Sequence, residues 1–385
     1  MFLKLFLTLI LGISLHAKLV IPDILKPSKD ANVSKVISTF QRTGPTVQIG
    51  ILLDTSGSMN GLINQAREQV WKIVNEVSSA NKNDEDVTIQ VGLFEYGKDS
   101  IPKYEGYLQM LSPLSSDLDN VSKELFALRT NGGSEYSGKV ILEAVNRFAW
   151  SNHKDDLKIL IIAGNESFTQ GNVPYEKAIQ KARANGIIVN TIFCGDFNNG
   201  VELKWRDGAN LGGGKYFNID QDRKIIHIQT PYDDEIIILG KKINDTYIYY
   251  GQGHKERKVN MIMQDSNARG LSKSSYIQRS IVKSKKQYVQ KKYDAVESMD
   301  DVSFSSMRKE EIPNILQNKS EDEIKQVLKE MKEKRATLKK KISELEAKRK
   351  EYVFSHKPSK SEDLGSVIVK SIKEQAVSNG FKFKK

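Results

Sequence analysis

Three oxygen-bearing side chains at alternate positions, Asp54, Ser56 and Ser58, form the clearest candidate site in the sequence. They follow the run 47–53, in which five of seven residues are apolar, as expected for a buried central strand of a parallel sheet. Ligands of open α/β sheets bind outside the carboxyl ends of the strands. One carboxylate and two hydroxyls suit a hard divalent cation such as Mg²⁺, Ca²⁺ or Mn²⁺. The alternative is a helix N-cap, because Asp and Ser commonly begin helices.

A second loop, residues 131–138, contains two adjacent glycines, opens another helical segment and offers the hydroxyl of Ser134. Together the two loops resemble the von Willebrand factor type A (VWA) domain and its metal-ion-dependent adhesion site, of an exported bacterial type. That family has Asp-x-Ser-x-Ser, then a Thr in a Gly-rich loop, then an Asp after a later strand. Ser134 falls at the Thr position and keeps the hydroxyl.

The last element of the family pattern is absent. The family Asp aligns with Gly164, which follows the apolar strand 158–162. Glu166, Asn165 or a water molecule are the candidates to replace that ligand. The resemblance covers residues 43–225, and it implies a divalent cation, Mg²⁺ or else Ca²⁺ or Mn²⁺, held at this edge of the sheet.

The resemblance implies a binding module and not an enzyme. In the family, the cation keeps one coordination position free for a carboxylate from a protein partner. A metal-dependent hydrolase is the first alternative, and it would need Glu135, Glu166 or Asp196 as a general base. The second alternative is a structural scaffold whose site is degenerate and metal-free.

Independently of the family, strands alternating with helices predict an α/β fold with a Rossmann-like, doubly wound and mostly parallel sheet. The expected strands are 47–53, 87–94, 159–162, 187–193 and 215–219, with a weaker edge strand at 104–111. The expected helices are 59–80, 138–150, 174–184 and 199–211. The single cysteine, Cys194, excludes an intrachain disulfide and is expected to be a small buried apolar residue.

The first residues predict export. A lysine at position 4, an apolar run over 5–15 and Ala17 indicate a secretory signal peptide over residues 1–17, with an uncleaved anchor as the alternative. The apolar run is too short for a membrane span, and no later stretch is long enough. The mature chain is therefore expected in the periplasm or outside the cell, beginning with a linker or arm over residues 18–42.

Charge is divided unevenly along the chain. Residues 251–385 hold 32 Lys or Arg against 19 Asp or Glu, whereas residues 1–250 hold 27 against 29. This asymmetry suggests an acidic partner. In an exported protein, an acidic envelope surface or protein fits better than nucleic acid.

The region after the sheet is expected to be mostly helical. Residues 226–319 form a basic extension that begins with a helix over 232–249, and residues 357–385 form a final helix and tail. Between them, residues 320–356 begin with a capping box and repeat apolar residues every seven positions. Arg335 and Arg349 interrupt this heptad pattern, which favours a helix packed on its own domain over a dimeric coiled coil. Because the predicted strands all precede residue 220, the sheet is expected to fold without residues 251–385.

Overall fold

A computed structural model of the chain describes residues 44–220, 227–288, 293–356 and 364–383. The expected signal peptide and arm, residues 1–17 and 18–42, lie outside the described residues. The first residues of the expected final helix, 361–363, lie outside them as well.

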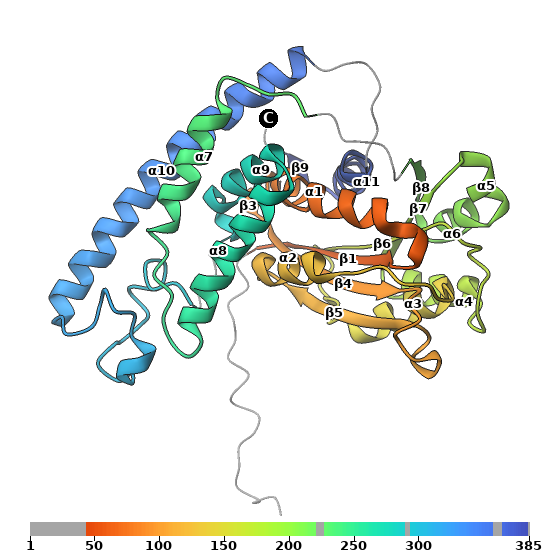
Figure 1. Cartoon of the computed structure of the whole chain (residues 1–385), viewed down its shortest axis with the longest axis horizontal. Helices are drawn as coiled ribbons and strands as arrows, with labels where there is room; N and C mark the ends of the chain where they lie inside the picture. The colour runs from red at the N-terminus through yellow and green to blue at the C-terminus, as the bar shows by residue number, and fades with distance from the viewer. Residues whose placement is uncertain (1–43, 221–226, 289–292, 357–363, 384–385) are drawn as a thin grey trace, which may run out of the picture. The chain divides into compact units, whose positions relative to one another are not determined.

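A six-stranded sheet forms the centre of the fold, with the order β5-β4-β1-β6-β7-β8 (Figure 1). Only β5 runs antiparallel to its neighbour. The strands are β1 (Thr46–Asp54), β4 (Thr88–Tyr96), β5 (Leu108–Ser115), β6 (Leu157–Gly164), β7 (Ile187–Cys194) and β8 (Gly213–Ile219). The mostly parallel α/β fold predicted from the sequence is therefore confirmed, although the edge strand begins at residue 108 and not 104.

The central strand β1 pairs in parallel with both β4 and β6, and it is buried along most of its length. Gly50 of β1 lies opposite Gly92 of β4. A Cβ on either glycine would come within 3.0 Å of the Phe148 ring. The two glycines thus make room for a large aromatic side chain against the middle of the sheet.

Helices cover both faces of this sheet (Figure 1). On one face lie α1 (Asn60–Val77), α2 (Leu118–Ala127) and α11 (Leu364–Ser378). On the other lie α3 (Ser137–Arg147), α4 (Tyr175–Ala184) and α6 (Trp205–Leu211). The sequence did not predict α2. The single helix expected over 199–211 is instead two, α5 (Phe197–Glu202) and α6, because Lys204 between them has a left-handed backbone with φ of 72°.

Three helices follow the sheet: α7 (Asp233–Asn244), α8 (His254–Leu271) and α9 (Lys273–Ser284). The helix expected over 232–249 thus ends early, and residues 247–249 are buried outside it. Beyond α9, the described residues up to 319 contain only short 3-10 turns, Lys286–Tyr288 and Lys309–Glu311.

The heptad segment forms one long helix, α10 (Glu321–Ser355), with the predicted capping box at Ser320. Its apolar seam is buried against the chain's own elements, as the packed-helix interpretation expected. The two arginines that interrupt the seam are buried as well. Arg335 pairs with Asp294, and the Nε of Arg349 lies 2.9 Å from Asp233.

The last residues return to the sheet region. Helix α11 packs along α1, and the strand β9 (Lys382–Phe383) joins β2 (Ala80–Lys82) and β3 (Glu85–Asp86) in a small second sheet. Residues from α8 to β9 share one apolar core with the central sheet. The expectation that residues 251–385 are dispensable conflicts with this shared core, because their removal would expose α1 to solvent.

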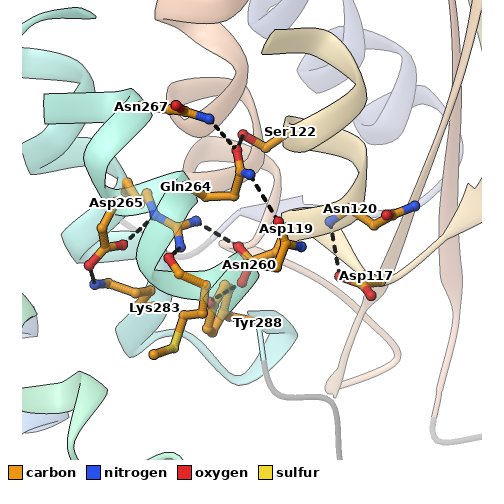
Figure 2. Close-up of polar contacts among 12 residues, drawn as sticks. Asp117, Asp119, Asn120, Ser122, Asn260, Gln264, Asp265, Asn267, Lys283 and Tyr288 are labelled. Carbon is orange, nitrogen blue, oxygen red and sulfur yellow. Dashed lines mark hydrogen bonds and ion pairs between the residues drawn. The ribbon is translucent and has the colours of Figure 1, made fainter. Parts of the chain in front are cut away.

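Buried charges join α2 to the later helices (Figure 2). The guanidinium of Arg279 is fully buried, with Nη1 2.7 Å from an oxygen of Asp119 in α2 and Nε 2.5 Å from Asp265 in α8. The second oxygen of Asp119 accepts a hydrogen bond from the Tyr288 hydroxyl at 2.7 Å. Lys283 donates to the other oxygen of Asp265 at 2.6 Å, so every charge in the cluster has a partner.

Replacing Arg279 by Met is expected to destabilise the protein strongly. The substitution would leave Asp119 buried without a cation and Asp265 with Lys283 alone, and breaking a buried ion pair typically costs about 3–5 kcal/mol. Urea unfolding would measure the loss. Lys273→Met is the matched control, because its pair with Asp234 is exposed, and its stability should stay close to that of the parent chain. Equal stabilities for the two variants would contradict the role given to this cluster.

Candidate metal-binding site

The predicted site residues come from three segments that meet at the carboxyl edge of the sheet. Asp54 is the last residue of β1, and the short 3-10 turn Gly57–Met59 leads from it into α1. Gly164 ends the neighbouring strand β6, directly before Asn165 and Glu166. The third segment, residues 128–136, connects α2 to α3 and contains Ser134.

Backbone contacts hold the third segment against the first. The N–H of Asn131 donates to the carbonyl of Thr55 at 3.0 Å, and the N–H of Asp99 donates to the carbonyl of Gly132. Gly133 packs so closely that a Cβ there would lie 2.7 Å from the carbonyl oxygen of Gly97. This close packing places the two following residues, Ser134 and Glu135, at the edge where β1 ends.

Asp54 is completely buried, and its carboxylate is half satisfied. Its Oδ1 accepts a hydrogen bond from the backbone N–H of Ser56 at 2.7 Å. The hydroxyl oxygens of Ser56 and Ser58 lie 3.3 Å apart, and the side-chain amide of Asn165 donates to Ser58 at 3.2 Å. The structure therefore brings Asp54, Ser56, Ser58 and Asn165 close together.

A second carboxylate, that of Glu135, lies beside Asp54. Both pack against Gly97, where a Cβ would lie 2.8 Å from Asp54 Oδ1 and 2.7 Å from Glu135 Cγ. Glu135 is 6% exposed, and its backbone N–H donates to Gln170 at 2.9 Å. From the sequence, Glu135 was a candidate only for the general base of a hydrolase. Its position directly after Ser134 in the glycine loop was the signal for a role beside Asp54.

Burial and mutual repulsion disfavour ionisation of these two carboxyl groups. Burial raises the pKa of Asp54 to about 6, partly offset by the hydrogen bonds from Ser56. Burial and the nearby charge of Asp54 raise the pKa of Glu135 to about 9. Glu166 adds a third negative charge that raises both pKa values. A cation at this place would relieve the repulsion.

Three buried oxygen atoms of the site accept no hydrogen bond from a neutral amide or backbone donor among the described residues: Asp54 Oδ2, Glu135 Oε2 and Asn165 Oδ1. Without a cation, a protonated Glu135 carboxyl can donate a hydrogen bond to Asp54. Carboxylate and amide oxygens accept hydrogen bonds or bind cations, and leaving one buried and unsatisfied costs about 1–3 kcal/mol. In the described part of the chain, no three His, Cys, Asp or Glu side chains gather as metal ligands. The donor set that fits a cation is therefore this mixed one of carboxylate, amide and hydroxyl oxygens.

The structure also explains why no aspartate stands at position 164. A Cβ on Gly164 would lie 2.5 Å from the hydroxyl oxygen of Tyr96 and 3.1 Å from Asp54 Oδ2. Tyr96 is fully buried, and its hydroxyl donates to the carbonyl of Ala163 at 3.0 Å. The tyrosine thus fills the space beside Gly164, where the family resemblance places its last ligand. The sequence analysis did not single out Tyr96, although it ends the strand next to β1.

The remaining candidates differ in how they are placed. Glu166 is exposed at the rim, where Gln170 lies 3.5 Å from its carboxylate. Asp196 lies at the start of α5, and one of its oxygens accepts hydrogen bonds from the backbone of residues 198 and 199, as a helix cap does. Cys194 is buried, and burial raises the pKa of its thiol, which disfavours the reactive thiolate.

Comparison with known proteins supports the fold assignment. Residues 48–221 match the family model of the von Willebrand factor type A domain. This part of the chain is therefore a VWA domain, and a helical C-terminal region with the long helix α10 follows it. VWA domains are generally interaction modules. No curated protein matches the chain.

Several solved structures are similar over slightly less than half of this chain. Proximal thread matrix protein 1 from the mussel byssus is 14% identical with a TM-score of 0.34, over 47% of this chain and 43% of that one. An aerotolerance-related membrane protein from Bacteroides fragilis is 17% identical with a TM-score of 0.33, over 46% of this chain and 93% of that one. The pilus adhesin SpaC from Lactobacillus rhamnosus is 16% identical with a TM-score of 0.33, over 47% and 28%. The chain thus spans less than half of the mussel protein and of the adhesin.

None of the described helices is both long enough and apolar enough to cross a membrane.

The stability of the metal-free protein is expected to fall as pH rises from about 5 to about 9. Unfolded Asp and Glu lose their protons near pH 4, whereas the folded chain keeps them up to about 6 at Asp54 and about 9 at Glu135. The folded state therefore binds more protons over this range, and each such proton costs up to about 1.4 kcal/mol per pH unit. Urea unfolding in EDTA at pH 5, 7 and 9 would measure the slope.

Glu135→Gln isolates this contribution from other titrating groups. The variant cannot ionise at position 135, so its stability should fall less than that of the parent between pH 6 and 9. Parallel pH profiles for the two proteins would show that Glu135 does not titrate as proposed.

Restoring the family aspartate should harm this protein. Gly164→Asp is expected to destabilise the fold by about 1–3 kcal/mol, because the new side chain meets the Tyr96 hydroxyl and the Asp54 carboxylate. Tyr96→Phe removes the hydroxyl that the new side chain would meet. This substitution should therefore lower the free energy of unfolding by less in the Gly164→Asp background than in the parent. Urea unfolding of the four proteins would measure this coupling. A Gly164→Asp variant as stable as the parent would refute the steric explanation.

Proposed function

We propose that the chain is an exported binding protein that engages a protein partner through a divalent cation at the edge of its VWA sheet. The observation that carries the proposal is the set of three buried oxygen atoms without donors, on Asp54, Glu135 and Asn165. Ser56, Ser58 and Ser134 supply hydroxyl oxygens, and Glu166 lies at the rim. Mg²⁺ is the first candidate, with Mn²⁺ and Ca²⁺ as alternatives.

The chemistry supports binding and not turnover. When bound, the cation would offer a coordination position to a carboxylate on the partner, as the family resemblance implies. Asp54 and the hydroxyls would hold it from the side of the sheet, because Asp54 is completely buried and Ser58 is exposed. The exposed side of the site is the side from which a partner can approach.

A metal-dependent hydrolase would need a general base in contact with water. Of the three candidates, Asp196 is engaged as a helix cap and Glu135 is buried. Glu166 is the candidate that is both exposed and free of a helix-capping role. A metal-free scaffold is the other alternative, in which the hydrogen bond from Ser56 to Asp54 serves only to shape the loop.

The basic C-terminal region is proposed as a second contact with an acidic envelope surface. Its surface charge is smaller than its composition indicates, because Arg279, Lys283, Arg335 and Arg349 are buried in ion pairs. Dimerisation through α10 has less support, because the apolar seam of that helix packs within the same chain. The proposal that the protein is exported depends on the prediction that residues 1–17 are a signal peptide.

Calorimetric titration with Mg²⁺ and Mn²⁺ would test the cation site. Asp54→Ala is expected to abolish binding, since it removes a buried carboxylate ligand. Ser56→Ala and Ser134→Ala should weaken binding by less, because water can replace a neutral hydroxyl. Glu166→Gln should cost about 10–100-fold in affinity if this rim carboxylate supports the cation through water.

Asp196→Asn is the matched control for these substitutions. It removes a carboxylate that follows a neighbouring strand but caps a helix, so cation affinity should not change. If the intact protein binds none of Mg²⁺, Mn²⁺ and Ca²⁺ at millimolar concentration, the proposal fails and the scaffold alternative stands.

A further inference from the structure

A pocket of about 410 Å³ opens between the start of α1 and the segment that follows α2. Its lining is Asn60, Ile63, Asn64, Arg67, Phe126, Leu128, Arg129 and Thr130. The charged members of this lining are two arginines, and no carboxylate is among them. Two amides and a hydroxyl add further polar groups. This composition is that of a site for an anion.

The pocket adjoins the candidate cation site. Across it, the hydroxyl of Thr130 donates to the side-chain oxygen of Asn60 at 2.7 Å. Asn60 begins α1 directly after the turn that carries Ser58. Asn131, the residue after Thr130, donates its backbone N–H to Thr55 at 3.0 Å. The two sites therefore adjoin along the chain, where Asn60 and Thr130 of the pocket lie directly next to the segments that shape the candidate cation site.

The two guanidinium groups converge on one carbonyl. The Nη2 of Arg67 donates to the carbonyl of Leu128 at 2.6 Å, and the Nη1 of Arg129 donates to the same oxygen at 2.7 Å. Burial, and to a smaller extent the charge of Arg129, lowers the pKa of Arg67. Two positive charges are thus held together with no negative side chain in the lining of the pocket.

A structural role accounts for one arginine and not for both. Arg67 is half-buried and also contacts the carbonyls of residues 125 and 126, so it satisfies the free carbonyl end of α2. Arg129 is exposed, and its Nε and Nη2 have no acceptor among the described residues. Its planar donors remain available to a ligand, in the geometry that matches a carboxylate.

We propose that Arg129, with the positive charge of Arg67 beside it, binds a carboxylate on an acidic segment of the protein partner. This inference rests on the proposed function, since the same segment would present a second carboxylate to the cation next to Asp54. An anion between the arginines would relieve their repulsion and use the free donors of Arg129. The partner's recognition element is therefore a segment with at least two acidic side chains.

The test uses the full chain and a hexaglutamate peptide as the probe, titrated in Mg²⁺ and again in EDTA. The parent protein should bind the peptide in both buffers, more tightly in Mg²⁺. Arg129→Gln should weaken binding about 10-fold or more in both, the usual effect of losing a charge-assisted hydrogen bond. Arg129 is exposed, so circular dichroism should show an unchanged fold.

Arg147→Gln is the matched control, because Arg147 is also an exposed arginine at the end of a helix, in the last turn of α3. It should leave the affinity for the peptide unchanged. Equal affinities of Arg129→Gln and Arg147→Gln, or no binding of the peptide by the parent in either buffer, would overturn the proposal.

The same titrations separate this inference from the cation proposal. Peptide binding that survives EDTA and Asp54→Ala but is lost in Arg129→Gln supports the arginine pocket even if no cation binds. Peptide binding that needs Mg²⁺ and is unaffected by Arg129→Gln overturns the arginine pocket and leaves the cation site standing.

Discussion

The buried pairing of Arg279 with Asp119 and Asp265 is the contact on which the arrangement of this protein depends. It ties α2, at the edge of the sheet, to α8 and α9 in the C-terminal region. A buried charge of this kind is stable only with its partners in place, so the later helices must be present for α2 to lie where it does. The segment that leaves α2 then leads directly to Ser134 and Glu135. The C-terminal region is therefore part of the support of the candidate site.

The candidate site holds two buried carboxyl groups although position 164 carries none. Tyr96 fills the space beside Gly164, where the family resemblance places an aspartate. A second carboxylate nevertheless lies against Asp54, and it comes from Glu135 in the loop after α2. Two buried carboxylates therefore lie at this sheet edge, one from a strand end and one from a loop. If a cation binds here as proposed, the loop after α2 would supply one of the carboxylates around it.

Local patterns predicted much of this architecture because they depend on residues close in sequence. The strand at 47–53, the Asp54 motif after it and the capping box of α10 were all visible in this way. Contacts between distant segments were not. The contact of the Tyr96 hydroxyl with position 164 and the pairing of Arg335 with Asp294 join residues far apart in sequence, so they become visible only in the folded chain. The same limit affected the charge count, since a composition does not show which arginines and lysines are buried.

The electrostatics of the edge connect the two proposed subsites. Asp54 and Glu166 alone would repel an acidic partner, because like charges in partly buried surroundings interact strongly. With a divalent cation among them the repulsion largely cancels, and the positive charges of Arg67 and Arg129 on the adjoining wall then dominate. An acidic segment would accordingly be attracted to this edge more strongly when the cation is present. The cation would then raise the affinity for any acidic segment, whereas the arginines would decide which acidic segments remain bound when it is absent.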